Sequence, residues 1–464
     1  MNVEASTVTE LDLSRYRRLV QEVNTLQHRG QVVQVIGLTI EAEGISPQLG
    51  ELCWVHTADD QATIAAEVVG FRKGYTLLMP LGEMAGIQPG SPVIATRNLF
   101  HVPVGPGLLG RVLDGLGNPI DGKGPLQAED FVTINNQAPH PLERRPIHQV
   151  LSTGVRAIDG LITVGKGQRM GIFAGSGVGK SSLLGMIARN ASADVNVIAL
   201  IGERGREVRE FIEHNLGAEG LARSVVVVST SDVAPLIRIK GAWVATAIAE
   251  YFRDVMGLDV TFMMDSVTRF AMAQREVGLA VGEPPAMKAY PPSVFALLPR
   301  LMERTGAGLT STITAFYTVL VEGDDFNEPI SDAARGILDG HMMLTRALAA
   351  ENHYPAIDVL HSASRLMTSL ATPEHLQAAG QLREALAVYE DAKDLINIGA
   401  YAPGSNPRID RALEVLEPIR RFLRQDSKTP SSFEETVAQL RGIFQEPGES
   451  ESAEAPEQSA QQTS

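Results

Sequence analysis

The stretch that most constrains this chain is RMGIFAGSGVGKSSLLGMIARN, residues 169–190. A short apolar run leads into a loop that contains Gly175, Gly177 and Gly179, and Lys180 and Ser181 then open a segment with helical apolar spacing. Strand, glycine-rich loop and helix in this order form a phosphate-binding loop, because glycines let backbone N–H groups and the helix N-terminus approach phosphate closely. The stretch therefore predicts a nucleotide-binding α/β domain.

The loop also predicts individual roles. Lys180 is expected to reach the β- and γ-phosphates, and Ser181 is expected to supply an oxygen to Mg²⁺. The position where such motifs usually begin with glycine holds Ala174, a departure that the remaining glycines outweigh. A dinucleotide fingerprint does not fit, because its third glycine would fall on Lys180. The predicted nucleotide-binding residues are Gly175, Ser176, Gly177, Val178, Gly179, Lys180, Ser181 and Ser182.

Apolar runs recur from about residue 150 to 365, as RMGIFA, VNVIALIG, SVVVVST, VTFMMDS and TITAFYTVLV, with helical segments between them. Strands that are apolar on both faces are typical of a mainly parallel sheet covered by helices. Asp265 stands at the carboxyl end of VTFMMDS, where such sheets present ligand groups, and it is expected to hold Mg²⁺ through water. Taken alone, Asp265 could instead cap a helix.

Glu203 and Arg204 directly follow the run VNVIALIG. A carboxylate at this place could orient and polarise the water that attacks a γ-phosphate, and the arginine could contact that phosphate. On its own, a Glu-Arg pair after a strand is more often a surface ion pair. Beside a phosphate-binding loop, the functional interpretation is favoured.

The segments on either side of this region have different patterns. Short apolar stretches separated by Gly, Pro and Asp predict a small closed β-barrel, and a Gly- and Asp-rich linker follows it. Helical periodicity dominates near the C-terminus, and a purely acidic stretch without bulky apolar residues ends the chain. We predict an amphipathic helix at 1–26, the barrel at 27–97, the nucleotide-binding domain with its linker at 98–365, helices at 366–445 and a disordered acidic tail at 446–464.

Composition argues against several classes of protein. The formal net charge is −15 and Lys and Arg form no run, which argues against a nucleic-acid groove. Cys53 is the single cysteine, so no internal disulfide is possible, and its apolar flanks predict a core position. No apolar run approaches the ~20 residues of a membrane span, and the first residues lack a signal-peptide pattern. We therefore expect a cytoplasmic protein.

Four long strings carry a resemblance: FAGSGVGKS, ADVNVIALIGERGREVREFIE, MMDSVTRFAMAQREVGLAVGEPPA and AFYTVLVEGDDFNEPISDAARGILDGH. They resemble the hexameric ATPase family that includes the catalytic and non-catalytic subunits of rotary ATP synthases and the export ATPases of type III secretion. Within it, the chain is most similar to the flagellum-specific export ATPases. The injectisome ATPases are the alternative, although they often carry Cys and Thr where this chain has Val178 and Ser181.

The resemblance implies a RecA-like central domain with ATP as substrate and Mg²⁺ as cofactor. It makes Glu203 the catalytic glutamate, Tyr354 of HYPAIDVLHSASR the aromatic that stacks on adenine, and Arg365 of the same string the finger offered to the neighbouring subunit. The non-catalytic synthase subunits lack the glutamate, so Glu203 implies hydrolysis. One sequence that carries both the glutamate and the finger implies a homohexameric ring.

The resemblance also implies partners and a location. These are a stator-like regulator at the N-terminal helix, a central stalk protein, the export gate and complexes of export chaperones with their substrates, with the ring peripherally associated with the inner-membrane export apparatus. The helix at 1–26 could equally pack on its own barrel. Two other classes remain open: a ring-shaped RNA translocase, which should have a basic, aromatic-lined barrel, and a nucleotide-binding scaffold that releases no phosphate.

Overall fold

The computed structural model describes residues 29–57, 62–321 and 328–445. The predicted N-terminal helix and the predicted acidic tail therefore lie outside the described residues. The chain divides into two units, residues 1–100 and residues 101–464, and each is described by itself.

The first unit is a small barrel with alternating inward and outward side chains. Its six strands close in the order β1-β2-β5-β4-β3-β6. Cys53 lies in the barrel core with Val55, Ala66 and Val93, and burial raises the pKa of its thiol to about 12. The strands are β1 (Arg29–Ile36), β2 (Thr39–Glu43), β3 (Glu51–His56), β4 (Thr63–Arg72), β5 (Tyr75–Pro80) and β6 (Pro92–Leu99).

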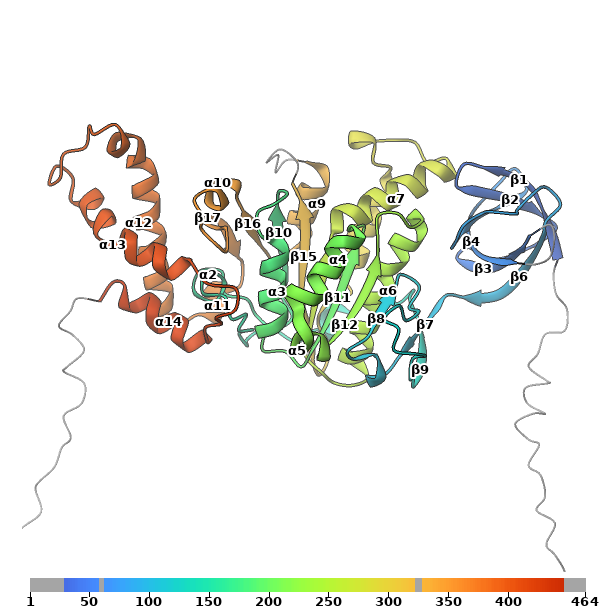
Figure 1. Ribbon diagram of the computed structural model, residues 1–464, viewed down its shortest axis with the longest axis horizontal. Helices are drawn as coiled ribbons and strands as arrows, with labels where there is room; N and C mark the ends of the chain where they lie inside the picture. The colour runs from blue at the N-terminus through green and yellow to red at the C-terminus, as the bar shows by residue number, and fades with distance from the viewer. Residues whose placement is uncertain (1–28, 58–61, 322–327, 446–464) are drawn as a thin grey trace, which may run out of the picture. The chain divides into compact units, whose positions relative to one another are not determined.

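A nine-stranded sheet forms the centre of the second unit (Figure 1). Its order is β17-β16-β10-β15-β13-β11-β12-β8, with β14 attached to β15. All pairs are parallel except β16 with β17 and β14 with β15. The strands are β8 (Val112–Asp114), β10 (Arg169–Ala174), β11 (Val195–Ile201), β12 (Ser224–Ser229), β13 (Val260–Asp265), β14 (Gly306–Ala307), β15 (Thr312–Leu320), β16 (Gly340–Leu344) and β17 (Ile357–Ser364).

The five apolar runs recognised in the sequence correspond to β10, β11, β12, β13 and β15. The sheet continues beyond them on both sides, because β8 comes from the Gly- and Asp-rich linker and β16 and β17 are short or partly polar. A separate two-stranded ribbon pairs β7 (His101–Val104) with β9 (Asp130–Thr133).

Helices connect the strands and continue into a C-terminal helical region (Figure 1). Each of α12, α13 and α14 begins behind a side-chain cap, from Thr372, Asn406 and Ser432 respectively. The helices are α2 (Arg156–Leu161), α3 (Lys180–Asn190), α4 (Gly205–Glu210), η3 (Phe211–Leu216), α5 (Gly217–Ala222), α6 (Pro235–Asp254), α7 (Val267–Val281), α8 (Pro292–Met302), α9 (Pro329–Ile337), α10 (Arg346–Ala350), α11 (Met367–Leu370), α12 (Pro373–Asn397), α13 (Pro407–Leu423) and α14 (Phe433–Gly442), with short 3₁₀ turns η1 (Pro106–Leu108), η2 (Pro141–Glu143) and η4 (Met287–Ala289).

One core joins the sheet to the C-terminal helices. Leu183 and Leu184 of α3 belong to the same buried cluster as Phe422 of α13 and Leu440 of α14. The C-terminal helices are therefore packed onto the nucleotide-binding domain, so that displacing them would expose apolar surface to water.

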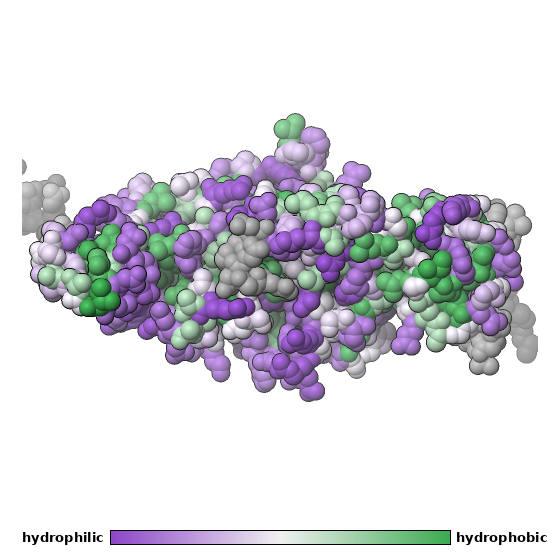
Figure 2. Space-filling view, turned by 90° about the horizontal axis from the view of Figure 1, so that it is seen from above, coloured by the Kyte–Doolittle hydropathy of each residue, from purple (hydrophilic) through white to green (hydrophobic). Residues whose placement is uncertain are grey.

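Polar residues predominate on much of the face seen in Figure 2, with apolar residues scattered among them. Across the described ranges, none of the helices combines the length and apolar character needed to cross a membrane. The predicted fold class is confirmed: an N-terminal β-barrel, a central domain with a mainly parallel sheet, and C-terminal helices.

Candidate nucleotide-binding site

The phosphate-binding loop joins the carboxyl end of β10 to the first turn of α3. Gly177 and Gly179 adopt φ angles of +79° and +87°, a left-handed conformation that glycine reaches without steric cost. Gly179 directly precedes Lys180, so the turn aims the first N–H groups of α3 back toward the loop. Within the loop, Val178 is buried, whereas Ser176 and Gly177 are exposed.

Lys180 lies between two carboxylates that come from neighbouring strands. Its Nζ is 2.5 Å from Asp265 Oδ1 at the end of β13 and 3.5 Å from Glu203 Oε1, which follows β11. The Thr318 hydroxyl of β15 donates to Asp265 Oδ1 at 2.7 Å. Since β11, β13 and β15 are parallel neighbours, the ends of these strands converge on one point of the sheet edge.

Burial controls the electrostatics of this cluster. It raises the pKa of Glu203 to about 7, and the negative charge of Asp265 adds to the effect while Lys180 opposes it. For Lys180, burial lowers the pKa, but the charges of Asp265 and Glu203 outweigh it and the pKa is raised. The lysine is thus cationic, and Glu203 exchanges its proton near neutral pH, as a general base should.

Tyr354 lies beside the phosphate-binding loop. A Cβ atom placed on Gly179 would be 3.4 Å from both Cδ1 and Cε1 of the Tyr354 ring. Tyr354 as a whole residue is 42% exposed, so part of it remains accessible to solvent. Arg346, the first residue of α10, lies against the other end of the loop, because a Cβ on Gly175 would be 3.2 Å from its guanidinium nitrogens.

Two predicted site residues do not join the cluster. The Arg204 side chain is 75% exposed and donates a hydrogen bond to Glu207 at 3.1 Å. Arg365 is exposed and follows β17, whose antiparallel pairing carries it to the opposite end of the sheet, where its N–H donates to the Asp339 carbonyl. The Asp339 carboxylate accepts a hydrogen bond from the backbone N–H of Arg169, the first residue of β10. Arg169 lies five residues before Ala174 at the end of that strand, which places this end of the sheet roughly 16 Å from the loop.

Sequence reasoning missed three residues at the site. Thr318 lies inside a strand, where a threonine is ordinary, and Arg346 follows the short strand β16. Arg269 of α7 packs on Gly202, directly before Glu203, and a Cβ on that glycine would be 2.7 Å from the Arg269 Cβ. The one available signal was that Arg269 lies four residues after Asp265, in the first turn of the helix that begins at the same sheet edge.

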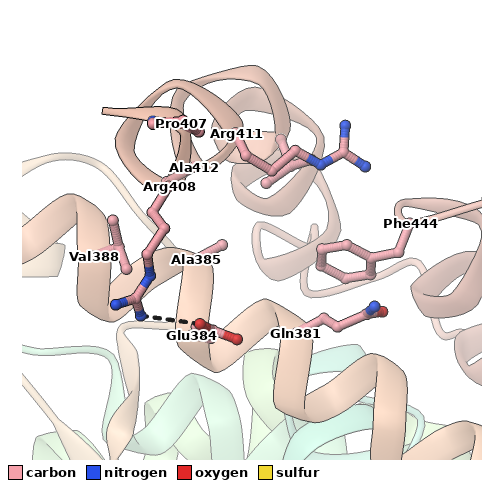
Figure 3. A pocket seen from close by; sticks show the side chains of 10 residues that line it. Gln381, Glu384, Ala385, Val388, Pro407, Arg408, Arg411, Ala412 and Phe444 are labelled. Atoms are coloured by element: carbon pink, nitrogen blue, oxygen red, sulfur yellow. Dashed lines mark hydrogen bonds and ion pairs between the residues drawn. The ribbon is translucent and has the colours of Figure 1, made fainter. Parts of the chain in front are cut away.

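A pocket of about 340 Å³ lies elsewhere, between α12 and α13 (Figure 3). Ala385, Val388 and Phe444 supply apolar surface to it, and the Arg408 guanidinium donates to Glu384 at 3.0 Å. None of its lining residues belongs to the predicted nucleotide site.

Family models match three parts of the chain. Residues 32–97 match the β-barrel domain of the ATP synthase alpha/beta family, and residues 154–364 match the nucleotide-binding domain of that family. Residues 371–442 match the C-terminal domain of the type III secretion ATPase EscN. With the loop geometry and the buried carboxylates, these matches define the class: the protein is a phosphate-loop ATPase of the alpha/beta type.

Individual relatives narrow this class. The chain is 55% identical over 425 residues to the flagellum-specific ATP synthase of Bacillus subtilis, covering 91% of this chain and 97% of that one. It is 53% identical over 428 residues to the type 3 secretion system ATPase of Xanthomonas euvesicatoria, covering 92% and 97%. The assembled ATPase EscN of enteropathogenic E. coli superposes with a TM-score of 0.85 at 45% identity, over 89% of this chain and 99% of that one. The chain belongs to the family of type III export ATPases, which includes the flagellum-specific enzymes.

Proposed function

We propose that this chain hydrolyses ATP at the carboxyl edge of its central sheet to drive protein export by the flagellar type III apparatus. The observation that carries the proposal is the buried Glu203 carboxylate, with a pKa of about 7, beside the loop lysine. A scaffold that only binds nucleotide has no need for such a group, whereas a hydrolase needs one to orient the attacking water.

The residues divide the task. Lys180 neutralises charge on the transferred phosphoryl group, and Glu203 accepts the hydrogen bond of the attacking water. Thr318 fixes the Asp265 carboxylate through its hydroxyl. The oxygen donors of Ser181 and Asp265 suit Mg²⁺, which keeps several waters of its own and would offset phosphate charge when bound. We propose that Arg204 contacts the γ-phosphate, which requires its exposed side chain to leave Glu207.

Glu203→Gln tests the hydrolytic role. The amide keeps the size of the side chain but cannot act as a base, so turnover should fall at least about a hundredfold while ATP binding persists. Phosphate release and equilibrium binding of ATP are measured on the same preparation. Glu213→Gln is the matched control, because Glu213 is an exposed glutamate paired with Arg209 on the same chain segment. Normal turnover in Glu203→Gln would refute the assignment.

We further propose that the active state is a homohexameric ring in which Arg365 completes the site of the next subunit. Arg365 is exposed and lies at the sheet end opposite to its own phosphate loop, so within one chain it cannot reach the nucleotide. The relative EscN has been solved as an assembled ATPase, which supports assembly here. A finger supplied in trans can raise turnover by ~10³-fold or more.

The injectisome branch is the second candidate, favoured by the 53% identity to the Xanthomonas euvesicatoria type 3 secretion ATPase. Expressing this chain in flagellar and injectisome ATPase deletion strains discriminates between the two. Restored motility without restored effector secretion supports the flagellar branch, and the reverse result supports the injectisome branch.

The proposed partners follow from the family. EscN has also been solved with its central stalk EscO, with a TM-score of 0.82 to this chain, and we propose that a comparable stalk protein binds here. A stator-like regulator at residues 1–26, the export gate and export chaperone–substrate complexes complete the set, with no nucleic acid expected. The proposed location is cytoplasmic and peripheral to the inner-membrane export apparatus. Co-sedimentation of the protein with membranes, measured with and without the other export components, would test this location.

A further inference from the structure

The segment between α13 and α14 contacts the nucleotide-binding domain near both ends of α3. Toward the beginning of α3, the Gln425 backbone N–H donates to the Tyr354 carbonyl at 2.9 Å. Toward its end, Arg189 donates to the Ser427 carbonyl at 2.6 Å. The C-terminal region is therefore bonded directly to the residue that lies beside the phosphate-binding loop.

The Gln425 side chain fixes the orientation of this backbone donor. It is 7% exposed, and its Oε1 accepts from the Arg156 N–H at 2.8 Å. Its Nε2 donates to the Gly154 carbonyl at 2.7 Å and to the Thr429 carbonyl at 2.8 Å. Both amide hydrogens and the amide oxygen are thus engaged, which leaves the buried residue a single satisfied orientation.

Arg156 extends the connection to α13. Its Nε donates to the Phe422 carbonyl at 2.7 Å, and its terminal nitrogen donates to the carbonyls of Arg421 and Arg424. A guanidinium at the carboxyl end of a helix satisfies open carbonyls and complements the helix dipole. The end of α13, Gln425 and the Tyr354 backbone consequently form one hydrogen-bonded unit.

We propose that Gln425 is a positioning residue for nucleotide binding. It sets where the Tyr354 ring lies against Gly179 and so makes the affinity for ATP depend on the position of α13. A partner that displaces α13 would then change nucleotide affinity without touching the phosphate-binding loop. The inference rests on the proposed function, in which Tyr354 stacks on the adenine.

Steady-state ATP hydrolysis by the full chain tests the proposal. Gln425→Ala should raise KM for ATP about fivefold while kcat changes less than about twofold, because the residue acts on binding and not on the chemical step. Arg189→Ala is the matched control: it removes a hydrogen bond between the same segment and α3 but leaves the contact to Tyr354 intact, so KM should not change. Equal effects of the two variants would show a general loosening of the interface and overturn the proposal.

Tyr354→Ala separates this inference from the proposed function. Loss of a base-stacking aromatic should raise KM about tenfold, and adding Gln425→Ala in that background should have little further effect. An unchanged KM in Tyr354→Ala would refute the adenine contact itself. If KM is raised in Tyr354→Ala, two further results would refute only the positioning role of Gln425. One is that Gln425→Ala by itself leaves KM unchanged, and the other is that the effects of the two substitutions on KM multiply fully in the double variant. If Gln425→Ala fails to fold, Gln425→Glu, which keeps the acceptor for Arg156 and loses both donors, should also raise KM.

Discussion

Lys180 and Glu203 show how burial and charge set the chemistry of single residues. Both are withdrawn from water, yet their pKa values are raised for different reasons: Glu203 by burial first, and Lys180 because neighbouring carboxylates outweigh burial. The result is a cation that persists at neutral pH next to a carboxyl that can take up a proton there. This combination suits charge stabilisation beside a base.

The pH dependence of kcat/KM for ATP tests the proposed role of Glu203 as the base in the free enzyme. A raised pKa means that protonation inactivates the base at a higher pH than for an ordinary glutamate, so kcat/KM should rise with pH around a midpoint near 7. The affinity of Glu203→Gln for ATP, measured over the same pH range, serves as the control. Its pH dependence includes the protonation of ATP but not that of the Glu203 carboxyl, which this variant lacks. A rate that stays flat down to about pH 5 would contradict the assignment.

The position of a site residue relative to the strands decides whether the sequence can predict it. Glu203 and Asp265 each end or follow an apolar run, and parallel strands present their carboxyl ends at one edge, so their approach to Lys180 was predictable. Thr318 was not, because a threonine within a strand has no distinctive pattern. Arg346 reaches Gly175 only through the pairing of β16 with β10, which the sequence does not reveal. The catalytic and binding roles stay predictions.

At the scale of elements, apolar patterning predicted the strands that are buried on both faces. It failed where this pattern is weak: β8 has three residues in a Gly- and Asp-rich segment, and β17 alternates exposed and buried positions at the sheet edge. The C-terminal helices were predictable from their periodicity, but their attachment through Arg156 and Gln425 depends on contacts between residues more than 250 positions apart.

A buried ion pair joins α6 to the segment that follows α8. Arg304 donates to Glu250 at 2.5 and 2.7 Å, with side chains 1% and 4% exposed. Arg304→Met would leave the carboxylate without its cation and should lower the free energy of unfolding by ~3 kcal/mol or more. Urea unfolding measures this, with Arg408→Met, which breaks the exposed pair with Glu384, expected to cost less than ~1 kcal/mol. Equal losses in the two variants would contradict the structural account.

The regulator proposal depends on residues 1–26, which lie outside the described residues. Deleting them should abolish capture of a stator-like partner and leave the melting temperature nearly unchanged, because a short terminal segment adds little to a core of this size. Capture by pull-down and thermal unfolding are measured on the same variant. A large fall in melting temperature would instead indicate that the segment packs on its own barrel.

At the scale of the whole molecule, we propose that one chain supplies two halves of a site that it cannot join by itself. One end of the sheet brings together Lys180, Glu203 and Asp265. Arg365 is exposed at the opposite end of the sheet, directly after the last residue of β17. In the proposed ring of identical copies, each Arg365 would approach the phosphate loop of its neighbour. The resulting ATPase should gain activity more steeply than linearly with protein concentration.

The most direct test of this shared site mixes two inactive variants. Lys180→Ala lacks phosphate binding, and Arg365→Ala lacks the finger, so each alone should be nearly inactive, and Arg365→Lys should not restore the planar fork. When their subunits are allowed to exchange, some interfaces pair an intact loop with an intact arginine, and partial ATPase activity should return. Titrating wild-type subunits with each variant controls for a requirement that all sites in a ring fire in sequence. The shared site would be contradicted if mixed rings form and hydrolyse no ATP although the titration shows that the sites need not fire in sequence.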